Sequence, residues 1–112
     1  MSMRSVSEAE FQAGIRPEGV TLVDFGAEWC PPCKVLLPRL KELDAELEGA
    51  VPMLKVDVDE SPALAEAFGV MSMPTVIVFK DGQPVEKLVG LQPKTAYRNV
   101  LARHMPEAAA RP

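Results

Sequence analysis

The two cysteines of this chain, Cys30 and Cys33, are separated by two residues, both of which are proline. A strand-like run precedes the pair and a helical pattern follows it, which places the pair at the N-terminus of a helix. Unpaired backbone N–H groups at that end favour negative charge, so a cysteine there loses its proton more readily. Because the thiolate is the form that attacks disulfides, the pattern predicts thiol–disulfide exchange.

The two sulfurs are expected to have different roles. Cys30 is the predicted nucleophile, open to solvent at the helix cap, whereas Cys33 lies one turn inside and is predicted to be buried. The N–H of Cys33 is the donor expected to reach the Cys30 sulfur, since Pro31 and Pro32 have no N–H. Cys33 would then resolve the mixed disulfide and release the reduced substrate. A structural disulfide or a pair of core thiols is the alternative, which a reducing compartment and the helix-cap spacing oppose.

Composition excludes several other classes of function. The chain has 112 residues, of which 47% are hydrophobic, enough for one domain with its own core. Its net charge of −4, without a basic patch, argues against nucleic acid or an anionic membrane as partner. With no bilayer-length apolar run and no secretory signal, the sequence predicts a cytoplasmic protein. No metal is expected, because a zinc site needs about four ligands and only His104 could join the cysteines.

Local patterns predict the elements that position the cysteines. A capping-box sequence indicates a first helix over 8–13. The apolar run at 20–25 is typical of a strand buried on both faces, and leucines at helical spacing predict a long helix over 31–48. A strand over about 51–58 would complete a right-handed βαβ unit with parallel strands.

The second half of the chain predicts an antiparallel hairpin between two helices. Asp81-Gly82 is a strong turn signal between two strand-like runs. Capping by Ser61 and a proline after it are expected to open the first helix. The whole chain, 1–112, is therefore interpreted as one α/β domain with a central mixed sheet and helices on both faces. The expected elements are a helix from Ser61-Pro62 to Gly69, strands over 75–79 and about 84–89, a helix from near Pro93 to Pro106, and a frayed tail over 106–112.

The motifs and their order resemble the thioredoxin family over about residues 7–104. They are Val23-Asp24-Phe25, Ala27 to Lys34, Pro38, Lys55 to Asp59, Met73-Pro74-Thr75, Phe79 to Gly82 and Val89-Gly90. A C-x-x-C pair alone is a modest signal, but followed about 40 residues later by Met-Pro-Thr it is a strong one. The resemblance implies the thioredoxin fold and a protein-disulfide reductase with disulfide-containing protein substrates and no bound cofactor. It also implies recharging by thioredoxin reductase, a flavoprotein that draws electrons from NADPH; a monomer is the default.

The resemblance also implies roles for residues around the cysteines. Asp24 would exchange a proton with Cys33 through water, with its pKa raised by burial and with Lys55 as its partner. A solvated residue at a strand end is the alternative for Asp24. The Met73–Pro74 bond would be cis, and the backbone before Pro74 would pair with an extended substrate segment. From the sequence alone, a trans proline opening a strand is favoured.

Trp29, Gly90 and the backbone of Met73 are expected to form a flat apolar surface around Cys30. A tryptophan beside a reactive cysteine is suited to partner contact, although a plain core position is the alternative. Two functional alternatives also remain: an oxidant or isomerase with the same scaffold, and a non-catalytic binding subunit.

Two positions depart from the family pattern. Pro31 replaces the usual glycine of the active-site dipeptide, and we expect this change to alter the reduction potential because Pro32 disfavours helical backbone at the residue before it. Gly26 replaces a residue that is usually aromatic, which removes a large side chain from beside the active-site helix.

Overall fold

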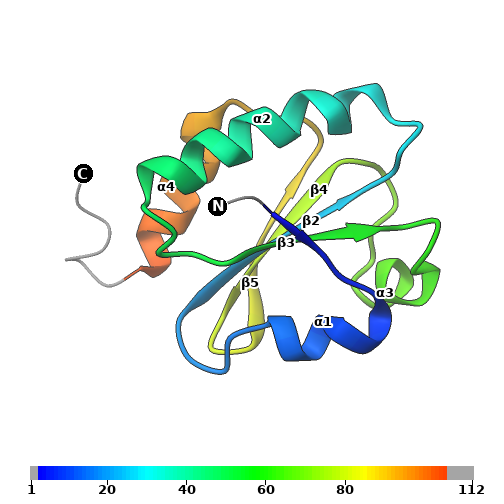
Figure 1. The fold of residues 1–112 in the computed structure, drawn as a ribbon, viewed down its shortest axis with the longest axis horizontal. Helices are drawn as coiled ribbons and strands as arrows, with labels where there is room; N and C mark the ends of the chain where they lie inside the picture. Colours follow the sequence, from blue (N-terminus) through cyan, green and yellow to red (C-terminus); the bar gives the residue numbers. More distant parts are fainter. Residues whose placement is uncertain (1–2, 106–112) are drawn as a thin grey trace.

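The computed structural model describes residues 3–105 and has the predicted mixed sheet at its centre (Figure 1). The strands lie in the order β1-β3-β2-β4-β5. Strand β2 is parallel to β3 and antiparallel to β4, so the strand that leads to the cysteines lies in the middle of the sheet. The elements are β1 (Arg4–Ser5), α1 (Glu8–Gly14), β2 (Val20–Gly26), α2 (Pro31–Glu46), β3 (Met53–Asp57), α3 (Pro62–Ala67), β4 (Thr75–Lys80), β5 (Gln83–Val89) and α4 (Lys94–His104).

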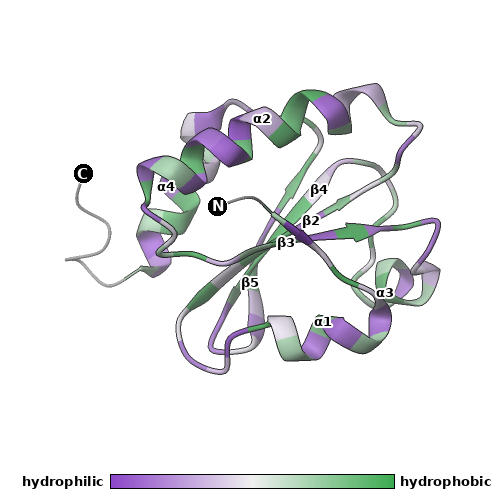
Figure 2. Cartoon of the chain, viewed as in Figure 1, coloured by the Kyte–Doolittle hydropathy of each residue, from purple (hydrophilic) through white to green (hydrophobic). Residues whose placement is uncertain are grey.

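Helices cover both faces of the sheet, as predicted: α2 and α4 on one face, α1 and α3 on the other (Figure 1). Side chains alternate along β2, so Val20 and Leu22 pack in the cluster with α2 and α4. Val23 and Phe25 pack in the opposite cluster, with α1 and α3. Figure 2 shows apolar and polar segments alternating along α2, as expected of a helix with one buried face. By the same alternation, Asp24 lies on the face that α2 covers.

Local capping and turn signals predict their elements well. Ser7 and Glu10 form the expected capping box of α1, with the Ser7 hydroxyl accepting from the Glu10 N–H at 3.3 Å and the Glu10 carboxylate accepting from the Ser7 N–H at 2.9 Å. At the hairpin, Asp81 and Gly82 have φ values of +54° and +83°, as both central residues of a type I′ turn require. Ser61 is the N-cap residue of α3 and Pro62 its first residue, as predicted, but within the described residues the Ser61 side chain makes no capping hydrogen bond.

Several observed elements differ from the predictions. Helix α2 stops two residues early, at Glu46, because Glu48 and Gly49 adopt left-handed φ values of +53° and +73°. Strand β3 begins only after Pro52, which has no N–H for the ladder and whose oxygen accepts from the Leu22 N–H at 3.0 Å. The sequence does not predict strand β1, because two residues are too few to show a pattern. The predicted tail over 106–112 lies outside the described residues.

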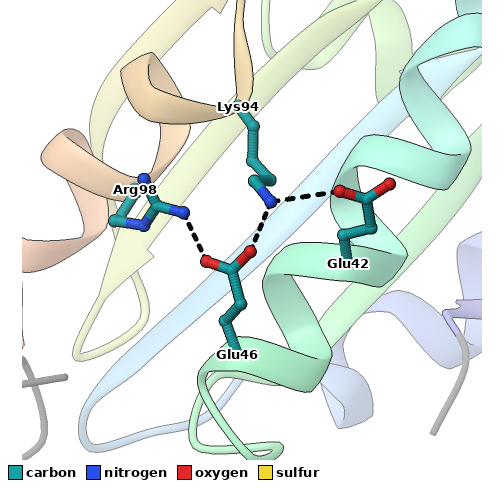
Figure 3. Close-up of polar contacts among 4 residues, drawn as sticks. All are labelled: Glu42, Glu46, Lys94 and Arg98. Carbon is teal, nitrogen blue, oxygen red and sulfur yellow. Dashed lines mark hydrogen bonds and ion pairs between the residues drawn. The ribbon is translucent and has the colours of Figure 1, made fainter.

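Ion pairs join α2 and α4 on their solvent side (Figure 3). Lys94 pairs with Glu42 at 3.1 Å and also with Glu46, and Arg98 pairs with the second oxygen of Glu46. Exposed pairs contribute little individually, but here one carboxylate serves two cations. Among residues 3–105, every helix is too short or too polar to span a lipid bilayer.

Candidate active site

Cys30 and Cys33 form a disulfide at the N-terminus of α2, with their Cα atoms 5.3 Å apart. Cys30 is the N-cap residue, with extended backbone (φ −98°, ψ 106°), and Pro31 is the first helical residue. Both cysteines are buried, with 3% of Cys30 and 6% of Cys33 exposed. The predicted burial of Cys33 is confirmed. The predicted openness of Cys30 is wrong for the disulfide form, because Cys30 packs with Ala27 and the partly buried Met73.

The backbone donors of this first turn also differ from the prediction. The N–H of Cys33 donates to the backbone oxygen of Cys30 at 3.1 Å, where the sequence predicts a bond to the sulfur. The N–H of Lys34 shares the same acceptor at 3.4 Å. Pro31 and Pro32 are exposed and have no N–H to offer. The positive end of the helix dipole favours a thiolate at Cys30.

Asp24 is a buried carboxylic acid in the middle of the sheet, not a solvated residue at a strand end. Only 2% of it is exposed, and within residues 3–105 its Oδ1 atom has no hydrogen-bond partner. It lies opposite Lys55 in the register of β2 and β3. Burial raises the pKa of Asp24 to about 7, and the positive charge of Lys55 limits the rise. A carboxyl group with such a pKa can take up and release protons at neutral pH.

The missing side chain of Gly26 brings Asp24 and Cys33 to a common cavity. Gly26 lies two residues after Asp24 and therefore on the same face of β2. A Cβ atom at this position would lie 3.2 Å from the Cys33 sulfur and 3.8 Å from Asp24 Oδ1. Beside these atoms is a cavity of about 230 Å³, whose lining includes the exposed residues Glu28 and Lys34. The cavity therefore connects the buried acid and the second sulfur to the surface.

Trp29 lies on the surface beside the disulfide, with 62% of it exposed, so it is not a core residue. Its indole N–H donates to Asp59 Oδ2 at 2.6 Å, which fixes the orientation of the ring. Asp59 follows β3 in a turn where Asp57 Oδ1 accepts from the N–H groups of Asp59 and Glu60 at 2.8 and 3.2 Å. The sequence contains no signal that identifies Asp59 as the tryptophan's partner.

The segment before β4 approaches the disulfide from the other side. The Met73–Pro74 peptide bond is cis, which excludes the trans alternative, and Met73 packs against the cluster that contains both cysteines. The Thr75 hydroxyl donates to the Ser72 backbone oxygen at 2.6 Å. Gly90, with φ +82°, donates its N–H to the Pro74 oxygen at 2.8 Å. Gly90 therefore lies beside the cis proline.

The family model described as Thioredoxin matches residues 2–103. The chain belongs to the thioredoxin family. It is 51% identical over 105 residues to a thioredoxin of Staphylococcus aureus, covering 94% of this chain and 100% of that one. It is a protein-disulfide reductase that works by dithiol/disulfide exchange, and disulfides are its substrates.

Solved thioredoxin structures have the same fold. A mutant thioredoxin from Halobacterium salinarum is 34% identical with a TM-score of 0.84, covering 94% of this chain and 92% of that one. A thioredoxin from Plasmodium falciparum is 35% identical with a TM-score of 0.81, covering 90% of this chain and 98% of that one. In the part of this chain that the structure describes, no group of three or more His, Cys, Asp or Glu side chains is placed to hold a metal ion.

Two residues that the sequence analysis missed anchor the segment that follows β5. The Arg39 guanidinium, on α2, donates to the backbone oxygen of Gln92 at 2.7 Å. The Tyr97 hydroxyl, on α4, accepts from the Gln92 N–H at 3.1 Å. Both helices thereby fix the chain just beyond Gly90. No local pattern predicts these contacts, because each joins residues whose approach depends on the packing of the helices.

Proposed function

We propose that Cys30 is the nucleophile of this reductase and Cys33 its resolving cysteine. The Cys30 thiolate attacks a substrate disulfide and forms a mixed disulfide, and the other substrate sulfur leaves as a thiolate and takes a proton from water. Cys33 then loses its proton and attacks the Cys30 sulfur, which closes the Cys30–Cys33 disulfide and releases the second substrate thiolate. Two electrons pass from the protein to the substrate, and the Cys30–Cys33 pair ends up oxidised.

The observation that carries this proposal is the disulfide at the N-terminus of α2, which lies close to a buried acid. Asp24 is the proposed acceptor of the Cys33 proton, and its side chain is on the same sheet face as that sulfur. Because burial raises the pKa of Asp24 to about 7, a substantial fraction is ionised at neutral pH and can accept a proton. Lys55 is proposed to help keep this acid ionised through its charge.

The surface around the disulfide is the proposed site for an extended segment of the substrate. Trp29 and the backbone of Met73, Pro74 and Gly90 are proposed to contact that segment. The exposed Pro31 and Pro32 form the rigid loop between the two sulfurs. An exposed aromatic ring held by one hydrogen bond is suited to contact a protein partner without losing much conformational freedom.

Family membership supports the remaining proposals. Electrons would come from NADPH through a flavoprotein thioredoxin reductase, and the protein itself would hold no cofactor besides its redox-active disulfide. We place the protein in the cytoplasm, as a monomer whose single domain spans 1–112.

Trapping of the mixed disulfide tests the two cysteine roles. The variant Cys33→Ser should form a stable disulfide between Cys30 and a substrate such as insulin, visible on a non-reducing gel and mapped by mass spectrometry. The matched variant Cys30→Ser should trap little or none. Stronger trapping by Cys30→Ser would reverse the assignment. Turnover is checked with the unchanged protein, which should accelerate insulin reduction by dithiothreitol.

A further inference from the structure

A polar atom that is unpaired in the described part of the chain and the volume of the cavity beside Gly26 indicate that water molecules occupy this cavity. The Asp24 Oδ1 atom, buried beside the cavity, is without a hydrogen-bond partner among the described residues. Such buried oxygens are normally satisfied, often by an ordered water. The cavity volume of about 230 Å³ exceeds the roughly 30 Å³ share of a water molecule, so it has room for several.

We propose that Gly26, by having no side chain, keeps this cavity open to water, and that this water carries the proton between Asp24 and solvent when Cys33 resolves the mixed disulfide. The inference rests on the proposed roles of Cys33 and Asp24. It assigns to Gly26 the function of a positioning residue, which controls access to the acid and does not itself react.

The geometry around residue 26 explains why only glycine leaves the path for water between Asp24 and solvent fully open. A Cβ atom at residue 26 would lie 3.2 Å from the Cys33 sulfur, closer than an ordinary van der Waals contact, and 3.8 Å from Asp24 Oδ1. Any side chain therefore starts within 4 Å of both groups that must exchange the proton. The φ value of Gly26 is not in the left-handed region, so alanine or phenylalanine would not strain the backbone.

The proton transfer balances without an added reactant. The Cys33 thiol gives its proton to the Asp24 carboxylate directly or through a cavity water, which leaves a thiolate and a neutral acid. The thiolate bonds to the Cys30 sulfur and breaks the bond to the substrate, which leaves as a thiolate. Asp24 then returns the proton to solvent through the cavity.

Several charged and titratable groups face Asp24 and its cavity from the neighbouring elements, and the test must allow for them. The apolar Val76 of β4 is opposite Asp24 in the sheet register and contributes no charge. The groups are Lys55 from β3, Cys33 and Lys34 from α2, Glu28 from the preceding loop, and the Tyr97 phenol from α4, whose own pKa is raised by burial and by the charge of Asp24.

The variants Gly26→Ala and Gly26→Phe fill the cavity in two steps. Removing water from a carboxylate disfavours its charged form, so the pKa of Asp24 should rise further. A rise from about 7 by about one pH unit would lower the ionised fraction at pH 7 from about half to about a tenth. The resolving step should then be about fivefold slower at pH 7 for Gly26→Phe, with Gly26→Ala between it and the unchanged protein.

The rates are measured by stopped flow with an aromatic disulfide whose released thiolate absorbs visible light. The first release reports attack by Cys30 and the second reports resolution by Cys33. For Gly26→Phe, the first phase should stay within about twofold, which also shows that the fold is intact, while the midpoint of the second phase shifts to higher pH. Absence of a second phase in the unchanged protein would contradict the proposed function itself.

The matched control is the same pair of glycine variants in an Asp24→Asn background. If Gly26 acts through Asp24, the second phase of Asp24→Asn should be slow, and adding Gly26→Phe should leave it unchanged within about twofold. Equal slowing by Gly26→Phe in both backgrounds would overturn the proposal, because it would show simple crowding of Cys33. An unshifted pH midpoint in both Gly26→Phe and Gly26→Ala would overturn it as well.

Discussion

The buried acid Asp24 should make the stability of the folded protein fall as pH rises. Burial raises its pKa from the ordinary value of 3.8 to about 7, so the folded state binds the proton more tightly than the unfolded chain. The stability that this bound proton contributes is fully present below the unfolded pKa. It is lost progressively as pH rises through the folded pKa, because folding then has to bury a charge.

The size of the effect follows from the difference between the two pKa values. They differ by about 3, and each pKa unit corresponds to about 1.4 kcal/mol. Replacing Asp24 with a neutral residue should therefore remove a penalty of up to about 4 kcal/mol above pH 7 and none below about pH 4. Between these limits, the gain in the free energy of unfolding should grow by about 1.4 kcal/mol per pH unit.

Urea unfolding of the disulfide form at several pH values between 3 and 9 measures this gain. Asp24→Asn keeps the size of the side chain but leaves an amide to satisfy, and Asp24→Ala creates a small cavity. These costs lower the whole curve by a different amount in each variant and do not depend on pH. The rise with pH should therefore be the same for both variants relative to the unchanged protein.

A gain that stays constant from pH 4 to 8 in both variants would refute the reasoning. It would mean that the Asp24 carboxyl loses its proton equally easily in the folded and unfolded states. A gain that falls with pH would mean that Lys55 outweighs burial and that the charged form is the favoured one. The comparison requires an unchanged denaturant slope, since a changed slope would indicate a different unfolded state.

Three further predictions concern the active-site prolines, the hydroxyl contact to Gln92, and the ion pairs between α2 and α4. Pro31→Gly should change the reduction potential because it relieves the restriction that Pro32 places on the preceding residue, and equal potentials in glutathione titrations would end this idea. Tyr97→Phe loses the acceptor for the Gln92 N–H and should lower the free energy of unfolding by about 1 kcal/mol in urea titrations; an unchanged midpoint would contradict it. Glu46→Gln breaks pairs with two cations, so in thermal melts it should destabilise more than Glu42→Gln, which breaks one. Both losses should shrink in about 1 M salt, and a loss independent of salt would argue against an ionic origin.

The parts of the fold that local chemistry specifies could be predicted from the sequence. The capping box of α1 and the Asp81-Gly82 turn each act within a few residues, so their signals are complete in the chain itself. Strand β1 could not be predicted in the same way, because two residues show no alternation and their pairing depends on β3 being in place.

In the candidate site, too, features set by local sequence could be predicted and features set by distant contacts could not. The spacing of Cys30 and Cys33 and the acid within an apolar strand predict a redox pair beside a buried carboxyl group, and the structure places them together. The burial of Cys30 was not predictable, because it depends on contacts from the distant Met73 loop. The sequence shows that Gly26 departs from the family pattern, but it does not show that Gly26 lies beside Cys33 of α2.

The two edge strands of the sheet affect whether copies of this protein associate with one another. One rim is β1, only two residues long, and the other is β5, where Pro84 lacks an amide proton and a bulge interrupts the register beside it. An incoming strand would meet few consecutive free amides at either rim, so extension of the sheet from one molecule to the next is disfavoured. A protein that reduces the disulfides of other proteins is thereby protected from pairing edge to edge with its own copies.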